Sequence, residues 1–79
     1  MKLFGYIASE PRKKPLELEE VTLVATPATI RRFASFLEES ASKMERSGSK
    51  FDHVHLLDAW SAWGANYPDF IVARSDDAA

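Results

Sequence analysis

The sequence predicts an α+β domain, a two-layer sandwich in which one long amphipathic helix covers a four-stranded antiparallel sheet in the order β-β-α-β-β. Two observations favour this fold. Residues 27–46 have the 3.6-residue periodicity of a helix, and four short segments rich in branched and aromatic side chains flank them in pairs. With 79 residues in all, we expect one domain over residues 1–74 and a polar, frayed tail over 75–79.

The first two strands are expected to pair before the helix begins. Residues 3–8 are mostly apolar, and a stretch with two prolines separates them from the strand-like residues 16–25. A connection this short favours antiparallel pairing. The apolar residues change sides between Leu18 and Val21, which predicts either a bulge near residues 19–20 or a strand that begins only after the leucines.

The helix has a start signal, an apolar arc and a stop signal. Thr26 can cap the first turn, Pro27 suits the first helical position, and residues 47–49 contain the glycine that favours an end. Because a sheet in the same chain needs covering, we expect the apolar arc to pack on it. The arc consists of Ile30, Phe33, Ala34, Phe36, Leu37, Ala41 and Met44.

Residues 51–60 fit two structures. As a strand, they would turn Val54 and Leu56 inward and both histidines toward the open face of the sheet. As a helix, they would align a stripe at i, i+4 and i+7, formed by Leu56, Trp60 and Trp63. We favour the strand, and we expect the last strand over residues 69–74.

The two histidines are the most distinctive feature of the chain. On a strand, His53 and His55 share one face, where zinc could bind them with Asp52, Asp58 or Asp69 as a third ligand. Acid–base catalysis is another use, with Asp52 or Asp58 orienting an imidazole. The chain has no cysteine, no glycine-rich phosphate loop and no serine-nucleophile motif. We therefore predict no enzyme, no cofactor and no metal, and keep a small metal-binding or catalytic domain as an alternative.

Aromatic residues beside the histidines predict a protein-binding surface. Accessible aromatic side chains often anchor protein interfaces, although either tryptophan could instead close one end of the core. The predicted surface comprises His53, His55, Asp58, Trp60, Trp63 and Tyr67. A second copy of the chain could also cover an open sheet face or a free edge strand, so a homodimer is a further alternative.

Charge and hydropathy exclude other classes of partner. The formal net charge is −2, which gives no general attraction to nucleic acid, and the only basic cluster is residues 12–14, flanked by glutamates. No apolar run is long enough for a membrane span, and the N-terminal apolar run is too short for a usual signal peptide. Together with the absence of cysteine, this predicts a soluble cytoplasmic protein.

Several segments together resemble one bacterial family. These segments are residues 1–6, residues 15–27, a helix with Phe33, Phe36 and Leu37, residues 51–56 and residues 68–72. They are similar to the thirty-second class of predicted immunity proteins of polymorphic toxin systems, most specifically in the Phe-Asp-His-x-His-Leu motif at 51–56. The resemblance implies a small cytoplasmic protein that binds a cognate toxin domain and blocks it by steric occlusion, without catalysis. It assigns no role to particular residues, and residues 61–67 look particular to this chain.

Overall fold

The computed structural model describes residues 1–12, 14–62 and 67–75. Apart from Ser75, the tail predicted over 75–79 lies outside these residues. Within them, the elements follow in the order β1 (Leu3–Gly5), β2 (Leu16–Leu18), α1 (Pro27–Ser47), the 3₁₀ turn η1 (Gly48–Lys50), β3 (His53–His55), α2 (Leu56–Ala59) and β4 (Ile71–Ala73). The α+β class is as predicted.

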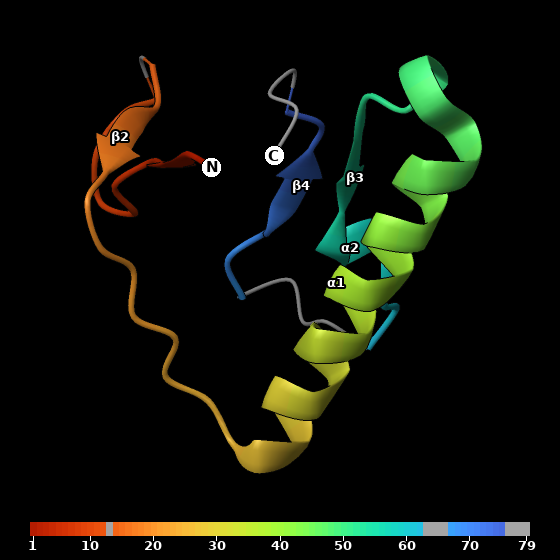
Figure 1. Cartoon of the computed structure of the whole chain (residues 1–79). Coiled ribbons are helices and arrows are strands. Elements are labelled where there is room, and N and C mark those ends of the chain that lie inside the picture. The colour runs from red at the N-terminus through yellow and green to blue at the C-terminus, as the bar shows by residue number, and fades with distance from the viewer. Residues whose placement is uncertain (13, 63–66, 76–79) are drawn as a thin grey trace.

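The predicted four-stranded sheet is wrong. The described strands form two separate antiparallel pairs, β1 with β2 and β3 with β4, and the two pairs share no hydrogen-bonded edge. Figure 1 shows why: the β1–β2 hairpin stands on one side of the molecule, and an extended connection carries the chain from it to the start of α1. The long helix therefore lies beside the β3–β4 pair, and the expected layer of four strands is replaced by this two-stranded pair.

The second predicted strand is much shorter than expected. It covers Leu16–Leu18 instead of residues 16–25, and residues 19–26 have no regular structure, so the predicted bulge does not occur. The reason is the length of the partner, because β1 offers only the three residues Leu3–Gly5 for pairing. The apolar residues beyond β2 consequently stay uncovered, and Val24 is 90% exposed.

Helix α1 confirms the predicted start and stop. The Thr26 hydroxyl accepts a hydrogen bond from the Thr29 amide at 3.3 Å, and Pro27 occupies the first turn. At the other end, Gly48 has φ of +55° while its amide donates to the Met44 carbonyl. Glycine adopts this left-handed conformation without the steric cost that a Cβ would impose.

The ambiguous segment contains both of the structures considered for it. His53–His55 is a strand, as favoured, but the chain turns at once into the four-residue helix Leu56–Ala59. The Leu56 amide donates to the Phe70 carbonyl at 2.8 Å, which fixes this corner to the segment before β4. Leu56 points inward, as expected, and its side chain is fully buried.

The core lies between α1 and the β3–β4 pair. Phe36, Phe51 and Leu56 are its buried apolar residues, and the Phe33 and Phe70 rings meet edge-to-face with centroids 4.6 Å apart. Ser40 is also buried on this side of α1. Its hydroxyl donates a hydrogen bond to the Phe36 carbonyl at 2.7 Å, so the buried hydroxyl has a partner. All of these residues belong to α1 and the part of the chain that follows it.

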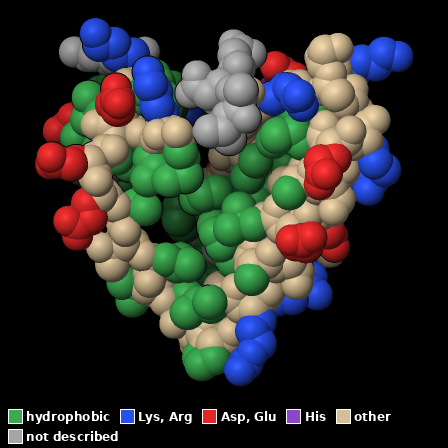
Figure 2. Space-filling view, in the orientation of Figure 1, with side chains coloured by type: hydrophobic (Ala, Val, Ile, Leu, Met, Phe, Trp, Pro, Cys, Tyr) green, Lys and Arg blue, Asp and Glu red, His purple; other side chains and the backbone are tan. Residues whose placement is uncertain are grey.

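The molecule as a whole is open. Its accessible surface is 6961 Å², whereas a compact monomer of 8.9 kDa exposes about 4,800 Å². The radius of gyration is 13.6 Å against about 12 Å for a compact chain of this length. Figure 2 shows a hollow between the β1–β2 side and α1, with hydrophobic side chains on both of its walls. No helix in the described part of the chain is long and apolar enough to cross a membrane.

Candidate functional site

The β3–β4 register separates an apolar face from a histidine face. His53 lies opposite Ala73, Val54 opposite Val72, and His55 opposite Ile71. Directly opposed residues of an antiparallel pair share a face, so both histidines lie with Ile71 and Ala73. Val54 is less exposed than His53, and Val72 is less exposed than Ile71 and Ala73. Val54 and Val72 also lie on the same side as Phe70, whose ring contacts Phe33 of α1. The imidazoles therefore point away from the core, as the strand interpretation predicts.

The first histidine pairs with its neighbour in the sequence. The Nδ1 atom of His53 lies 2.5 Å from a carboxylate oxygen of Asp52. The two side chains are 45% and 91% exposed, so water competes for this pair and its stabilising effect is small. The sequence named Asp52 as a group that could orient an imidazole, and the structure places it in that position.

The second histidine is held more firmly. The Nδ1 atom of His55 lies 2.6 Å from Asp69 Oδ2, and the amides of Leu57 and Phe70 donate to Asp69 Oδ1 at 3.2 and 2.9 Å. Their side chains are only 34% and 22% exposed. Partial burial opposes ionisation of Asp69, but the hydrogen bonds from His55, Leu57 and Phe70 outweigh it, so the pKa of this carboxyl is lowered.

Asp69 rather than Asp58 is thus the partner of His55. Sequence reasoning considered Asp69 only as a metal ligand, because fourteen positions separate the two residues. The pairing follows from the β3–β4 register, which brings the residue before β4 beside the end of β3. The sequence did contain a signal for this pairing, because an aspartate begins the last strand-like segment. A short polar side chain at that position can form hydrogen bonds both with the backbone and with a residue of the neighbouring strand.

The histidine face includes a shallow depression. Its lining residues come from α1, β3 and α2, and they are Lys43, His53, Val54, His55, Asp58 and Ala59. The two imidazole rings are tilted by 67° with centroids 5.0 Å apart. Three of the six predicted surface residues, the two histidines and Asp58, therefore do come together.

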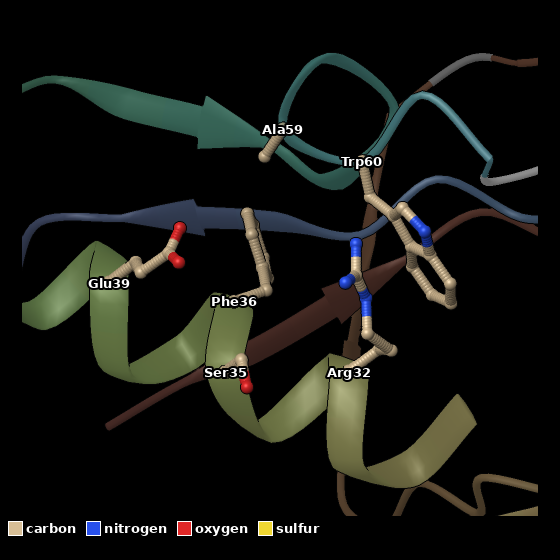
Figure 3. A pocket seen from close by; sticks show the side chains of 6 residues that line it. All are labelled: Arg32, Ser35, Phe36, Glu39, Ala59 and Trp60. Carbon is tan, nitrogen blue, oxygen red and sulfur yellow. The ribbon is translucent and has the colours of Figure 1, made fainter. Parts of the chain in front are cut away.

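Of the predicted aromatic anchors, Trp60 lies outside this depression. Trp60 borders a different pocket, between α1 and the end of α2, where the Arg32 guanidinium sits 4.9 Å above its ring (Figure 3). This contact and its partial exposure match a tryptophan that covers one end of the core. Tyr67 is exposed. Trp63 lies outside the described residues.

The hollow is the surface that sequence reasoning missed. Figure 2 shows it bordered by the chain before α1 and by α1 itself, and these two segments carry large apolar side chains that are at least two-fifths exposed. Within residues 3–37 they are Phe4, Tyr6, Ile7, Leu16, Val21, Leu23, Val24, Ile30 and Leu37. We call this set the hollow residues. The sequence contained a signal for this uncovered surface. One helix has too little apolar surface to cover both a sheet and the apolar side chains of Val21, Leu23 and Val24.

Comparison with known proteins adds no relative to this geometry. No family model, no curated protein and no solved structure matches the chain. The resemblance to immunity proteins therefore depends on the sequence segments alone.

Proposed function

We propose that this chain is a protein-binding module that neutralises a cognate bacterial toxin domain in the cytoplasm by steric occlusion, with no catalysis of its own. The observation that carries the binding part of this proposal is the uncovered apolar hollow (Figure 2). The toxin as the partner comes from the sequence resemblance to immunity proteins.

The amount of uncovered surface supports a protein as the occupant. The chain exposes about 2,000 Å² more than a compact monomer of its mass. A standard protein–protein interface removes about 800 Å² from each partner, so a partner could be accommodated within this excess. A small ligand would cover only a minor part of it, since such ligands bind in enclosed pockets.

The chemistry of the hollow also favours a folded protein over nucleic acid. Its residues are aliphatic and aromatic, and the whole chain is acidic, with a formal net charge of −2. Nucleic-acid sites are positively charged because they must neutralise phosphates. Apolar side chains of this kind form the buried centre of interfaces between proteins.

The histidine face offers a second contact surface on the same partner. No histidine is visible on the face of the molecule that carries the hollow in Figure 2. A large partner could still reach both surfaces, and the side chains of His53, Asp58 and Tyr67 are exposed. The surface predicted from the sequence, which includes these three residues, is the secondary part of the proposed interface.

The decisive experiment begins with the neighbouring gene. A secreted protein with a C-terminal toxin domain encoded immediately upstream should supply that domain as the probe. Co-expression with this chain should restore growth, and the two purified proteins should form a 1:1 complex by light scattering. Growth arrest despite co-expression, with no complex in solution, would remove the proposed function.

Two variants locate the contact. Val24→Glu and Leu37→Glu each place a charge at an exposed apolar position on a segment that borders the hollow, where folding tolerates it, and should weaken the complex at least tenfold. Arg31→Gln is the matched control, because it also lowers the net charge by one but lies on the polar side of α1. The free chain should be monomeric. A dimer that Val24→Glu dissociates would instead assign the hollow to a second copy.

A further inference from the structure

The histidine pair has a feature that protein binding does not require. Each imidazole has its Nδ1 atom committed to a carboxylate, His53 to Asp52 and His55 to Asp69. A neutral imidazole that donates from Nδ1 carries its lone pair on Nε2. Both histidines are thereby held in the tautomer in which Nε2 can accept a metal ion.

This arrangement matches the outer shell of known types of metal site. Metal-binding histidines nearly always donate their other ring N–H to a carboxylate, a carbonyl or water, which fixes the ring and raises its basicity. Asp69 is itself fixed by the amides of Leu57 and Phe70, so the His55 ring has support on a rigid strand end.

The separation of the rings is also suitable. Zinc–nitrogen bonds of about 2.0–2.1 Å place the ion about 3 Å from each ring centre, so two imidazoles at a tetrahedral angle have centres about 5 Å apart. The observed centroid separation is 5.0 Å. The spacing of the two rings is therefore compatible with one shared ion.

The rest of the coordination sphere is open. Within residues 1–12, 14–62 and 67–75, no group of three or more histidine or carboxylate side chains could hold a metal ion. Lys43 and Asp58 line the same depression, and their opposite charges offset one another beside the pair. Two protein donors leave positions for water or for a donor from another molecule, as in an exchangeable site.

We propose that His53 and His55 bind one divalent transition-metal ion through their Nε2 atoms, in an open two-histidine site. Imidazole donors suit Zn²⁺, Ni²⁺ and Cu²⁺, whereas Mg²⁺ and Ca²⁺ prefer oxygen ligands. The test of this site does not depend on the proposed toxin binding, because its readout needs the purified chain and the metal alone.

The test is zinc titration of the full, untagged chain, followed by calorimetry and by NMR of the imidazole nitrogens. Before zinc, both rings should carry the proton on Nδ1; with zinc, both Nε2 resonances should shift together. His53→Gln and His55→Gln should each raise the Kd at least tenfold. Cu²⁺ should bind more tightly than Zn²⁺, and Mg²⁺ should not compete.

Asp58→Asn is the matched control, because Asp58 lines the depression without being one of the two donors. Its Kd should stay within about threefold of the parent value, and amide spectra should show that every variant is folded. Zinc binding that survives both histidine substitutions, a shift in only one imidazole, or a loss in Asp58→Asn equal to that of the histidine variants would overturn the proposal.

Discussion

The two strand pairs of this protein have the same size but differ in what they pack against. Each consists of two three-residue strands in antiparallel register. The β3–β4 pair is joined to α1 by the Phe33–Phe70 ring contact and by a hydrogen bond from Arg74 Nη1 to the Met44 carbonyl at 3.3 Å. The β1–β2 pair stands apart, with its close packing at Gly5, where a Cβ would come within 3.2 Å of Leu18.

The difference shows that pairing between two strands does not by itself make a hairpin part of the hydrophobic core. A two-stranded hairpin is marginal in water unless it packs against something else. The second hairpin packs on α1, and the first presents its apolar residues to the hollow (Figure 2). We therefore expect the two halves to respond very differently to the same substitution.

The largest contrast should come from one substitution made in each hairpin region. Leu56→Ala removes a side chain with 0% exposure and should lower the free energy of unfolding by about 2–5 kcal/mol. Leu16→Ala, in the half-exposed β2 strand, should cost about 0.5 kcal/mol. Urea unfolding of the two variants measures both values.

Equal losses in this pair would mean that the hairpins share one core in solution. A large loss in Leu16→Ala would bring the first hairpin into the folding unit and remove the hollow on which the proposed function depends. A binding partner should have that effect: in the complex, the Leu16→Ala loss should grow while the Leu56→Ala loss stays the same.

Asp69 and Asp52 provide the next contrast, within the histidine face. Asp69→Ala leaves the amides of Leu57 and Phe70 without their acceptor and should cost about 1–3 kcal/mol. Asp52→Ala removes a 91% exposed carboxylate and should cost well under about 1 kcal/mol. If thermal unfolding shows the reverse order, the Asp69 network is not the anchor of this corner.

The start of α1 gives a smaller and local effect. Thr26→Ala removes the acceptor for the Thr29 amide and should cost about 1 kcal/mol of unfolding free energy. Thr22→Ala is the matched control, since Thr22 is exposed in the irregular connection after β2. Urea unfolding should show no loss for it. A similar loss in both would indicate that residues 19–26 are more ordered than the capping interaction alone requires.

The elements that the sequence predicted correctly are those set by local chemistry. The cap at Thr26, the proline start and the glycine end of α1 depend on neighbouring residues, and all three are confirmed. The β3 strand and its outward histidines follow from alternation over a few residues. The four-stranded sheet depended instead on contact between distant hairpins, which no local pattern encodes.

The candidate site was predictable to the same extent. His53, His55 and Asp58 come together because β3 and α2 are adjacent in the chain. The pairing of Asp69 with His55 and the hollow were not predicted, because both depend on tertiary arrangement. The pairing depends on the register between β3 and β4, and the hollow depends on the position of residues 3–25 relative to α1. Trp60, also predicted for the binding surface, contacts Arg32 of α1 instead of lining the depression beside the histidines.

The last and smallest contrast concerns acid. The pKa of Asp69 is lowered from its ordinary value of 3.8. Its charged form therefore contributes stability that is fully present above pH 3.8 and is lost as the pH falls through the lower folded-state value. The effect should be smaller than that of Asp69→Ala, because a protonated carboxyl still offers an oxygen to the two amides.

Unfolding free energies measured across this acidic range should reveal the linkage. The Asp69→Asn variant should lose less stability than the parent as the pH falls below 3.8. Taking the difference between this variant and the parent cancels the contributions of the other carboxylates. Parallel curves for Asp69→Asn and the parent would mean that the Asp69 carboxylate is not preferentially stabilised in the folded chain. In that case the support for the His55 ring would be weaker than its short distance to Asp69 suggests.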